Sequence, residues 1–215
     1  MVAPGAAAAA SAGGDARAAG GVQKGLDAAV ARAKAAHPDR LVEVWAEDEH
    51  RLGLKPVRRR VWAPVGARPV ALGHHRYEWL HVTAFVQPTS GRAIWYLSTG
   101  LSKPFSAELL AAFARQTGAG RRRSIVLVLD NAGWHGPVGL AVPEGISLVF
   151  LPPYSPELQP AKRLWPLVDE PIVNRHLATL AELDAIIAER CRRLGAAVIK
   201  PHIDFHWWPR PTKPN

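Results

Sequence analysis

The chain has 215 residues and a formal net charge of +9, and hydrophobic residues make up 48% of it, which excludes a wholly disordered protein. No apolar run approaches the roughly 20 residues of a membrane-spanning helix, and the N-terminus lacks the pattern of a secretory signal. The single cysteine, Cys191, excludes an internal disulfide and a cysteine-based metal cluster, so we expect a cytoplasmic protein.

The first half of the chain is predicted to hold a leader, a helix and several strands. Residues 1–21 are rich in Ala and Gly, and we expect them to be disordered because they can bury little apolar surface. A helix is predicted over 25–37, closed by Pro38. Strands are predicted at 41–51, at 57–70 with an exposed arginine face, and as a hairpin over 77–98 that turns at 88–91.

The second half alternates helices with apolar strands. Helices are predicted over 106–118 and over 179–195, the latter with Thr179 and Glu182 as a capping box. The apolar run 125–129 is typical of a strand buried on both faces, and "GISLVFLPPYSP" indicates another buried strand. These elements predict an α/β fold, a mixed sheet with helices on its faces. The chain then divides into the leader at 1–21, a domain at 22–195 and a Pro- and Trp-rich tail at 196–215 that no pattern places.

Acidic residues occur where two predicted strands end, Asp48 and Glu49 in one and Asp130 in the other. Oxygen ligands from adjacent strand ends suit a hard divalent cation, and two such ions about 3.5–4 Å apart can hold both reacting oxygens of a phosphodiester. The residues alone leave an alternative open, in which Asp48 and Glu49 are a solvated strand end and Asp130 begins a turn with Asn131.

Three segments in order, "VWAEDEHRLGLKPVRRRVWAPVGARP", "LVLDNAGWH" and "LPPYSPELQPAKRLW", resemble the DDE catalytic domain of bacterial insertion-sequence transposases related to mariner elements. The resemblance covers about residues 41–194. It implies an RNase H-like fold and the use of Mg²⁺ or Mn²⁺ to cut and join DNA. It also implies that Asp48 and Asp130 are catalytic metal ligands and that a third acid, a Glu, belongs at position 162.

Position 162 holds a lysine instead. If Gln159 caps a helix whose first residue is Pro160, Lys162 is the third residue, where free amide donors and the helix dipole favour an acid. An ammonium cannot ligate a cation, and it can instead pair with Asp48 or Asp130. We therefore expect a transposase-type endonuclease and strand transferase with impaired activity. The alternatives are an inactive remnant that binds DNA or a transposase partner, and an unrelated phosphatase or ribonuclease on the same fold.

The chain has 27 Lys and Arg against 18 acids, and this excess favours a polyanionic partner. A GC-rich genome that encodes Arg at solvent-exposed positions would give the same count. We expect Arg58, Arg59 and Arg60 to hold DNA phosphates without reading sequence. Full-length relatives carry N-terminal helix-turn-helix modules, so we expect this chain to be a truncated copy. Its expected partners are DNA and a second copy of itself or a full-length transposase subunit, with no membrane.

Four further residues have two interpretations each. His135 either positions a phosphate or a water near the metals, or orders the turn at 133–134. Glu49 is either an auxiliary ligand or, in the favoured interpretation, a solvent-facing strand end. Trp134 and Trp165 are expected in the core rather than stacked on bases. Asp169 lies too far along the helix to replace the missing acid, at about 1.5 Å of rise per residue.

Overall fold

The computed structural model describes residues 7–67, 70, 77–136 and 138–209. Its centre is a five-stranded sheet with the strand order β3-β2-β1-β4-β5. The strands are β1 (Leu41–Gly53), β2 (Trp79–Gln87), β3 (Arg92–Ser98), β4 (Arg123–Leu129) and β5 (Ile146–Phe150). β1, β2 and β3 pair antiparallel, whereas β4 is parallel to β1 and β5 is parallel to β4. The predicted mixed sheet is confirmed, and β1 and the apolar β4 are neighbours in it.

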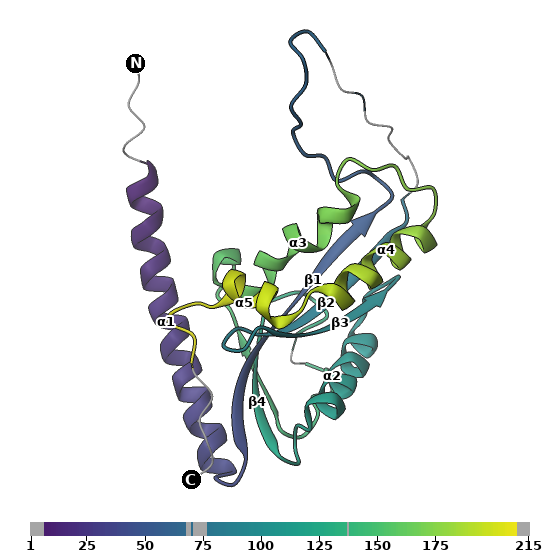
Figure 1. Ribbon diagram of the computed structural model, residues 1–215. Helices are drawn as coiled ribbons and strands as arrows, with labels where there is room; N and C mark the ends of the chain where they lie inside the picture. The colour runs from purple at the N-terminus through teal and green to yellow at the C-terminus, as the bar shows by residue number, and fades with distance from the viewer. Residues whose placement is uncertain (1–6, 68–69, 71–76, 137, 210–215) are drawn as a thin grey trace.

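Helices cover both faces of this sheet (Figure 1). One face carries α1 (Ala7–Ala36), the short α3 (Trp165–Asp169), α4 (Leu180–Arg193) and α5 (Ala196–Ile203), together with short 3₁₀ turns that include Pro160–Leu164. The other face carries α2 (Lys103–Thr117). The predicted helices at 106–118 and 179–195 are confirmed, with N-caps at Ser102 and Thr179.

The alternation of β1 assigns its acidic residues to different layers. Val44 and Ala46 pack into the core beneath α4 and α5, whereas Trp45 packs against α2, where its ring meets Phe113 edge-on at 5.2 Å. Successive side chains of a strand point to opposite faces. Asp48 therefore shares the layer of α4 and α5, and its two neighbours in sequence share the layer of α2.

Strand β4 is buried on both faces as predicted, because Ile125 and Leu127 belong to one core cluster and Val126 and Val128 to the other. The expectation of a second fully buried strand is wrong. β5 lies at the sheet edge, with β4 as its only partner among the described residues, and only Ile146 of this strand is fully buried. An edge strand has one unpaired side and is correspondingly less covered.

The predicted disordered leader is corrected for residues 7–21, which are part of α1. Alanine is the strongest helix former, so an alanine-rich segment can continue a helix that is anchored at its other end. Val22, Leu26 and Ala29 supply this anchor by packing into the core. The first six residues lie outside the described part of the chain.

The strand predicted at 57–70 is wrong. Residues 55–67 leave the sheet and extend away from it as a loop (Figure 1), in which Val57 forms an isolated bridge with Val173. Val61, Trp62 and Val65 are exposed. β1 already has partners on both sides, and three consecutive arginines interrupt the alternation that would give a strand an apolar face. Residues 68–69 and 71–76 lie outside the described residues.

The tail predicted to begin at residue 196 belongs to the domain. Its first residues form α5, and Ile199, Phe205 and Trp208 are buried in the same core cluster as α4. Residues 210–215 lie outside the described part. Among the described residues, no helix has both the length and the apolar character that crossing a bilayer requires.

Candidate active site at the ends of β1 and β4

The parallel pairing of β1 with β4 brings the two predicted aspartates to one edge of the sheet. Ala46 is in register with Val128, and Asp48 and Asp130 each follow two residues later. The carboxyl ends of neighbouring parallel strands are where α/β sheets form their sites. The expectation that these two aspartates come from adjacent strands is confirmed, and their role as metal ligands remains a prediction.

Asp48 is buried, with 1% of its side chain exposed, and both of its oxygens accept hydrogen bonds. Lys162 Nζ lies 2.7 Å from Oδ1, and Trp165 Nε1 donates to Oδ2 over 2.9 Å. Burial raises the pKa of Asp48 to about 6, although the hydrogen bonds from Lys162 and Trp165 act in the opposite direction. The interpretation of Asp48 as a solvated strand end is wrong.

Gln159 explains why Lys162 reaches this position. Its side-chain Nε2 donates to the backbone oxygen of Glu47 over 2.8 Å, which fixes the start of the Pro160–Leu164 turn on β1. Its Oε1 accepts from the amide of Ala161, so the predicted N-cap is confirmed. Lys162 is then the third residue of the turn and pairs with Asp48, one of the two partners that the sequence left open.

Asp130 is more accessible, with 36% of its side chain exposed. Its Oδ1 accepts from the amide of Ala132 over 3.0 Å, so it does open a turn, and it lies 3.2 Å from Nδ1 of His135. The hydrogen bond from His135 lowers the pKa of Asp130, against a smaller effect of burial. Asp130 and Lys162 both line a cavity of about 460 Å³ at the surface.

The side chains around Asp48 do not fit the two-ion site that the resemblance implies. Asp48 holds an ammonium and an indole N–H where a cation would require free carboxylate oxygens, and Lys162 offers no lone pair while it is charged. Asp169 does not replace the missing acid, because it pairs with His50 over 2.8 Å. Lys162 therefore occupies the position at which the resemblance implies a third ligand.

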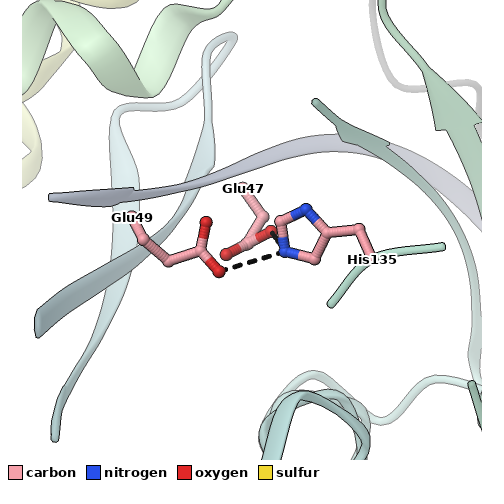
Figure 2. A group of neighbouring side chains, drawn as sticks. All are labelled: Glu47, Glu49 and His135. Atoms are coloured by element: carbon pink, nitrogen blue, oxygen red, sulfur yellow. Dashed lines mark hydrogen bonds and ion pairs between the residues drawn. The ribbon is translucent and has the colours of Figure 1, made fainter. Parts of the chain in front are cut away.

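A second polar cluster lies on the other face of β1, where Glu47 and Glu49 point toward His135 (Figure 2). His135 Nε2 lies 3.2 Å from Glu47 Oε2 and 3.0 Å from Glu49 Oε1. The expectation that Glu49 faces solvent is wrong, since its side chain is 7% exposed and accepts from Trp134 Nε1 over 2.6 Å. Glu47 was missed by the sequence reasoning, although a period of two already places it on the face of Glu49.

Protonation in this cluster differs from that of the free side chains. Burial, followed by the nearby charge of Glu49, raises the pKa of Glu47 well above its usual range. Burial alone would lower the pKa of His135, but hydrogen bonds to Asp130, Glu47 and Glu49 raise it far above its usual range. His135 therefore contacts three carboxylates, including Asp130 at the start of the turn, consistent with its predicted role in ordering the turn at 133–134.

The three arginines predicted to contact DNA lie in the loop that leaves β1. All three are exposed, and Arg59 pairs with Glu170 over 2.7 Å and donates its backbone N–H to Asn174. Their contact with DNA remains a prediction. Trp165 lies in the core as expected, with its ring stacked on His50 at a centroid distance of 5.0 Å.

The family model described as DDE superfamily endonuclease matches residues 43–184. A relative from Sinorhizobium fredii (strain NBRC 101917 / NGR234), the uncharacterized protein y4pE/y4sA, is 30% identical over 123 residues, which is 57% of this chain and 88% of the relative.

The fold is similar to that of the Mos1 transposase. The Mos1 mariner paired-end complex with Mn gives a TM-score of 0.57 at 16% identity, over 87% of this chain and 58% of the transposase. The Mos1 paired-end complex with the left transposon end gives 0.56 at 14% identity, over 89% of this chain and 60% of the transposase. The chain thus spans less than two thirds of these transposase chains, and the predicted RNase H-like fold is confirmed.

Proposed function

This chain belongs to the DDE superfamily endonucleases, and we propose that its substrate is the phosphodiester backbone of DNA. We propose further that the lysine at position 162 impairs this cleavage. One observation carries the proposal. Asp48 lies in β1 just past the part that pairs with β4, Asp130 directly follows β4, and the residue that meets Asp48 from the Pro160–Leu164 turn is Lys162.

The impairment follows from charge. In-line transfer of a phosphoryl group needs anionic ligands that hold two cations at the reacting oxygens. A divalent cation at Asp48 would have to displace the ammonium of Lys162, and the displaced charge would remain beside the ion. Asp48 and Asp130 are the proposed ligands of Mg²⁺ or Mn²⁺, and both effects weaken their binding of the ion.

A second candidate function is a module that holds DNA, or another transposase subunit, without cutting. The ion pair between Lys162 and Asp48 favours it, because this pair satisfies a buried carboxylate in the absence of metal. The net charge of +9 favours it as well, because phosphate contacts by Lys and Arg need no catalytic centre.

Plasmid nicking in Mg²⁺ or Mn²⁺ distinguishes the two candidates. The parent chain should nick supercoiled DNA slowly or not at all, and Lys162→Glu should increase the rate. Adding Asp130→Ala to the Lys162→Glu protein should abolish the gain, which controls for a contaminating nuclease.

If the parent nicks DNA briskly and still does so after Asp130→Ala, the cleavage site does not include Asp48 and Asp130. DNA binding by the parent, with no nicking by either protein, would favour the holding function. Either result would contradict the proposal that Lys162 causes the loss of cleavage.

A further inference from the structure

His135 makes contacts that a single neutral imidazole cannot satisfy. Its Nδ1 lies 3.2 Å from Asp130 Oδ1, which fixes a proton on that nitrogen. Its Nε2 lies 3.0 Å from Glu49 Oε1 and 3.2 Å from Glu47 Oε2. Two carboxylate oxygens so close to a nitrogen lone pair repel it unless a positive species lies between them. This species is either a proton or a cation.

The balance of charge favours a cation of higher charge. Glu47, Glu49 and Asp130 surround one imidazole, and the first two carboxylates are nearly inaccessible to solvent. In the part of the chain that the structure describes, His135 is the sole basic side chain paired with Glu47 or Glu49. With one proton on the imidazole, the buried group keeps excess negative charge unless Glu47, whose pKa is raised, takes up a second proton. A divalent cation compensates the carboxylates without that second proton, and buried charge is costly unless it is compensated.

Ser106 provides an independent observation. This residue of α2 is 5% exposed, and among the described residues its buried Oγ has no hydrogen-bond partner. It lines a small cavity together with Glu47, Glu49 and His135, and the rest of the lining is apolar: Phe85, Leu109, Leu110 and Leu129. A buried hydroxyl usually has a partner, so its position here indicates a ligand or a water bound to one.

We propose that Glu47, Glu49 and His135 Nε2 bind one divalent transition-metal ion, such as Zn²⁺ or Mn²⁺, with Ser106 or a water in a remaining position (Figure 2). The ligand atoms of Glu47, Glu49 and His135 all lie within 4.8 Å of one another. With metal–ligand bonds near 2.1 Å, the two short contacts of Nε2 subtend about 90–100° at the ion, between octahedral and tetrahedral angles. On binding, the ion replaces the Nε2 proton, which passes to solvent.

The donor set selects the class of metal. Imidazole with carboxylates suits Zn²⁺ and Mn²⁺, whereas Mg²⁺ and Ca²⁺ prefer oxygen ligands alone. Asp130 accepts from the other nitrogen of His135 and so orients the ring, as carboxylates commonly do behind metal-bound histidines. The site lies on the α2 face of β1, opposite to Asp48, and it does not depend on the proposed cleavage of DNA.

Titration of the purified, EDTA-treated chain with Zn²⁺ by calorimetry tests the proposal. We expect one ion per chain. Glu47→Gln and Glu49→Gln should each weaken binding at least about tenfold. Glu108→Gln is the matched control, because it makes the same change at an exposed carboxylate of α2, and it should change the affinity by less than about twofold.

Absence of one-site binding in the parent would overturn the proposal and leave a proton in the cluster. Equal binding by the parent and both Gln variants would also overturn it, by placing the ion elsewhere. Circular dichroism checks that each variant is folded. If the Gln variants do not fold, the ¹⁵N resonance of His135 Nε2 in the parent decides: it should shift on addition of Zn²⁺, and an unchanged resonance contradicts the site.

Discussion

Lys162 Nζ lies 2.7 Å from Oδ1 of the buried Asp48, at the position where the resemblance to transposases expects a glutamate. The pair joins the Pro160–Leu164 turn to β1, so it links the proposed loss of cleavage to the stability of the domain.

Lys162→Glu should destabilise the metal-free protein by about 1–3 kcal/mol. The change breaks an ion pair to a buried carboxylate and adds a like charge, and the partial exposure of Lys162 reduces the loss below that of a fully buried pair. The favourable interaction of Glu with a helix N-terminus, about 0.3–1 kcal/mol, is smaller. Added Mg²⁺ or Mn²⁺ should raise the melting temperature of this variant more than that of the parent, because binding to the native state stabilises it.

Lys162→Gln is the control for that experiment, since it removes the ammonium without supplying a carboxylate. Its metal-induced shift should lie between those of the parent and of Lys162→Glu, because the opposing charge is gone but no third carboxylate is supplied. Equal shifts in the parent and in Lys162→Glu would mean that residue 162 does not contribute to a metal site.

Trp165→Phe should destabilise the domain by about 1–2 kcal/mol, because Asp48 Oδ2 loses an N–H donor in a buried environment. A phenyl ring can still stack on His50, but it is smaller than the indole, so a cavity in the core adds to this loss. Unfolding in urea measures the effect. Trp62→Phe makes the same chemical change at a fully exposed residue and should stay within about 0.5 kcal/mol of the parent. Equal losses in the two variants would contradict a stabilising role of the indole N–H.

Arg58→Ala combined with Arg60→Ala should reduce the salt dependence of DNA binding. Each lost phosphate contact lowers the slope of log K against log salt by about 0.9, so two contacts account for about 1.8. Arg192→Ala with Arg193→Ala is the matched control, since these exposed residues of α4 carry the same charge. Binding to a duplex at several salt concentrations gives the slopes. Equal slopes for both pairs would indicate an effect of net charge rather than contact by the loop.

Cys191 should be protected from thiol reagents at pH 8. Burial raises the pKa of the Cys191 thiol to about 12, so the folded chain holds almost no thiolate at that pH. Labelling should be at least about 100-fold slower than that of a free cysteine. In urea, one thiol per chain should react at the rate of free cysteine. The raised pKa contributes stability that is present below about pH 9 and is lost as pH rises toward 12. Fast labelling without denaturant would contradict the burial of this residue.

Patterns confined to one segment predicted the fold well. The apolar run 125–129 predicted a strand buried on both faces. The glutamine and proline before Lys162 predicted a helix start, which the structure shows as a 3₁₀ turn with the same cap and with Lys162 as its third residue. Each pattern depends on short-range rules of strand and helix formation, which hold wherever the segment lies in the fold.

Features that depend on distant partners were not predictable in this way. Glu49 looked like a solvated strand end because neither α2 nor His135 is adjacent to it in sequence, and both bury it in the folded chain. Residues 57–70 looked like a strand, but both sides of β1 are taken by segments that follow later in sequence. Burial and pairing of these residues were decided by topology.

The alternation of β1 also has an evolutionary consequence. Three consecutive codons, those of Glu47, Asp48 and Glu49, specify groups that work on opposite sides of one strand. A substitution beside Asp48, such as one at position 162, changes the proposed cleavage site and leaves the carboxylates beside His135 in place. The two faces of β1 can therefore change independently of each other at neighbouring positions of the sequence.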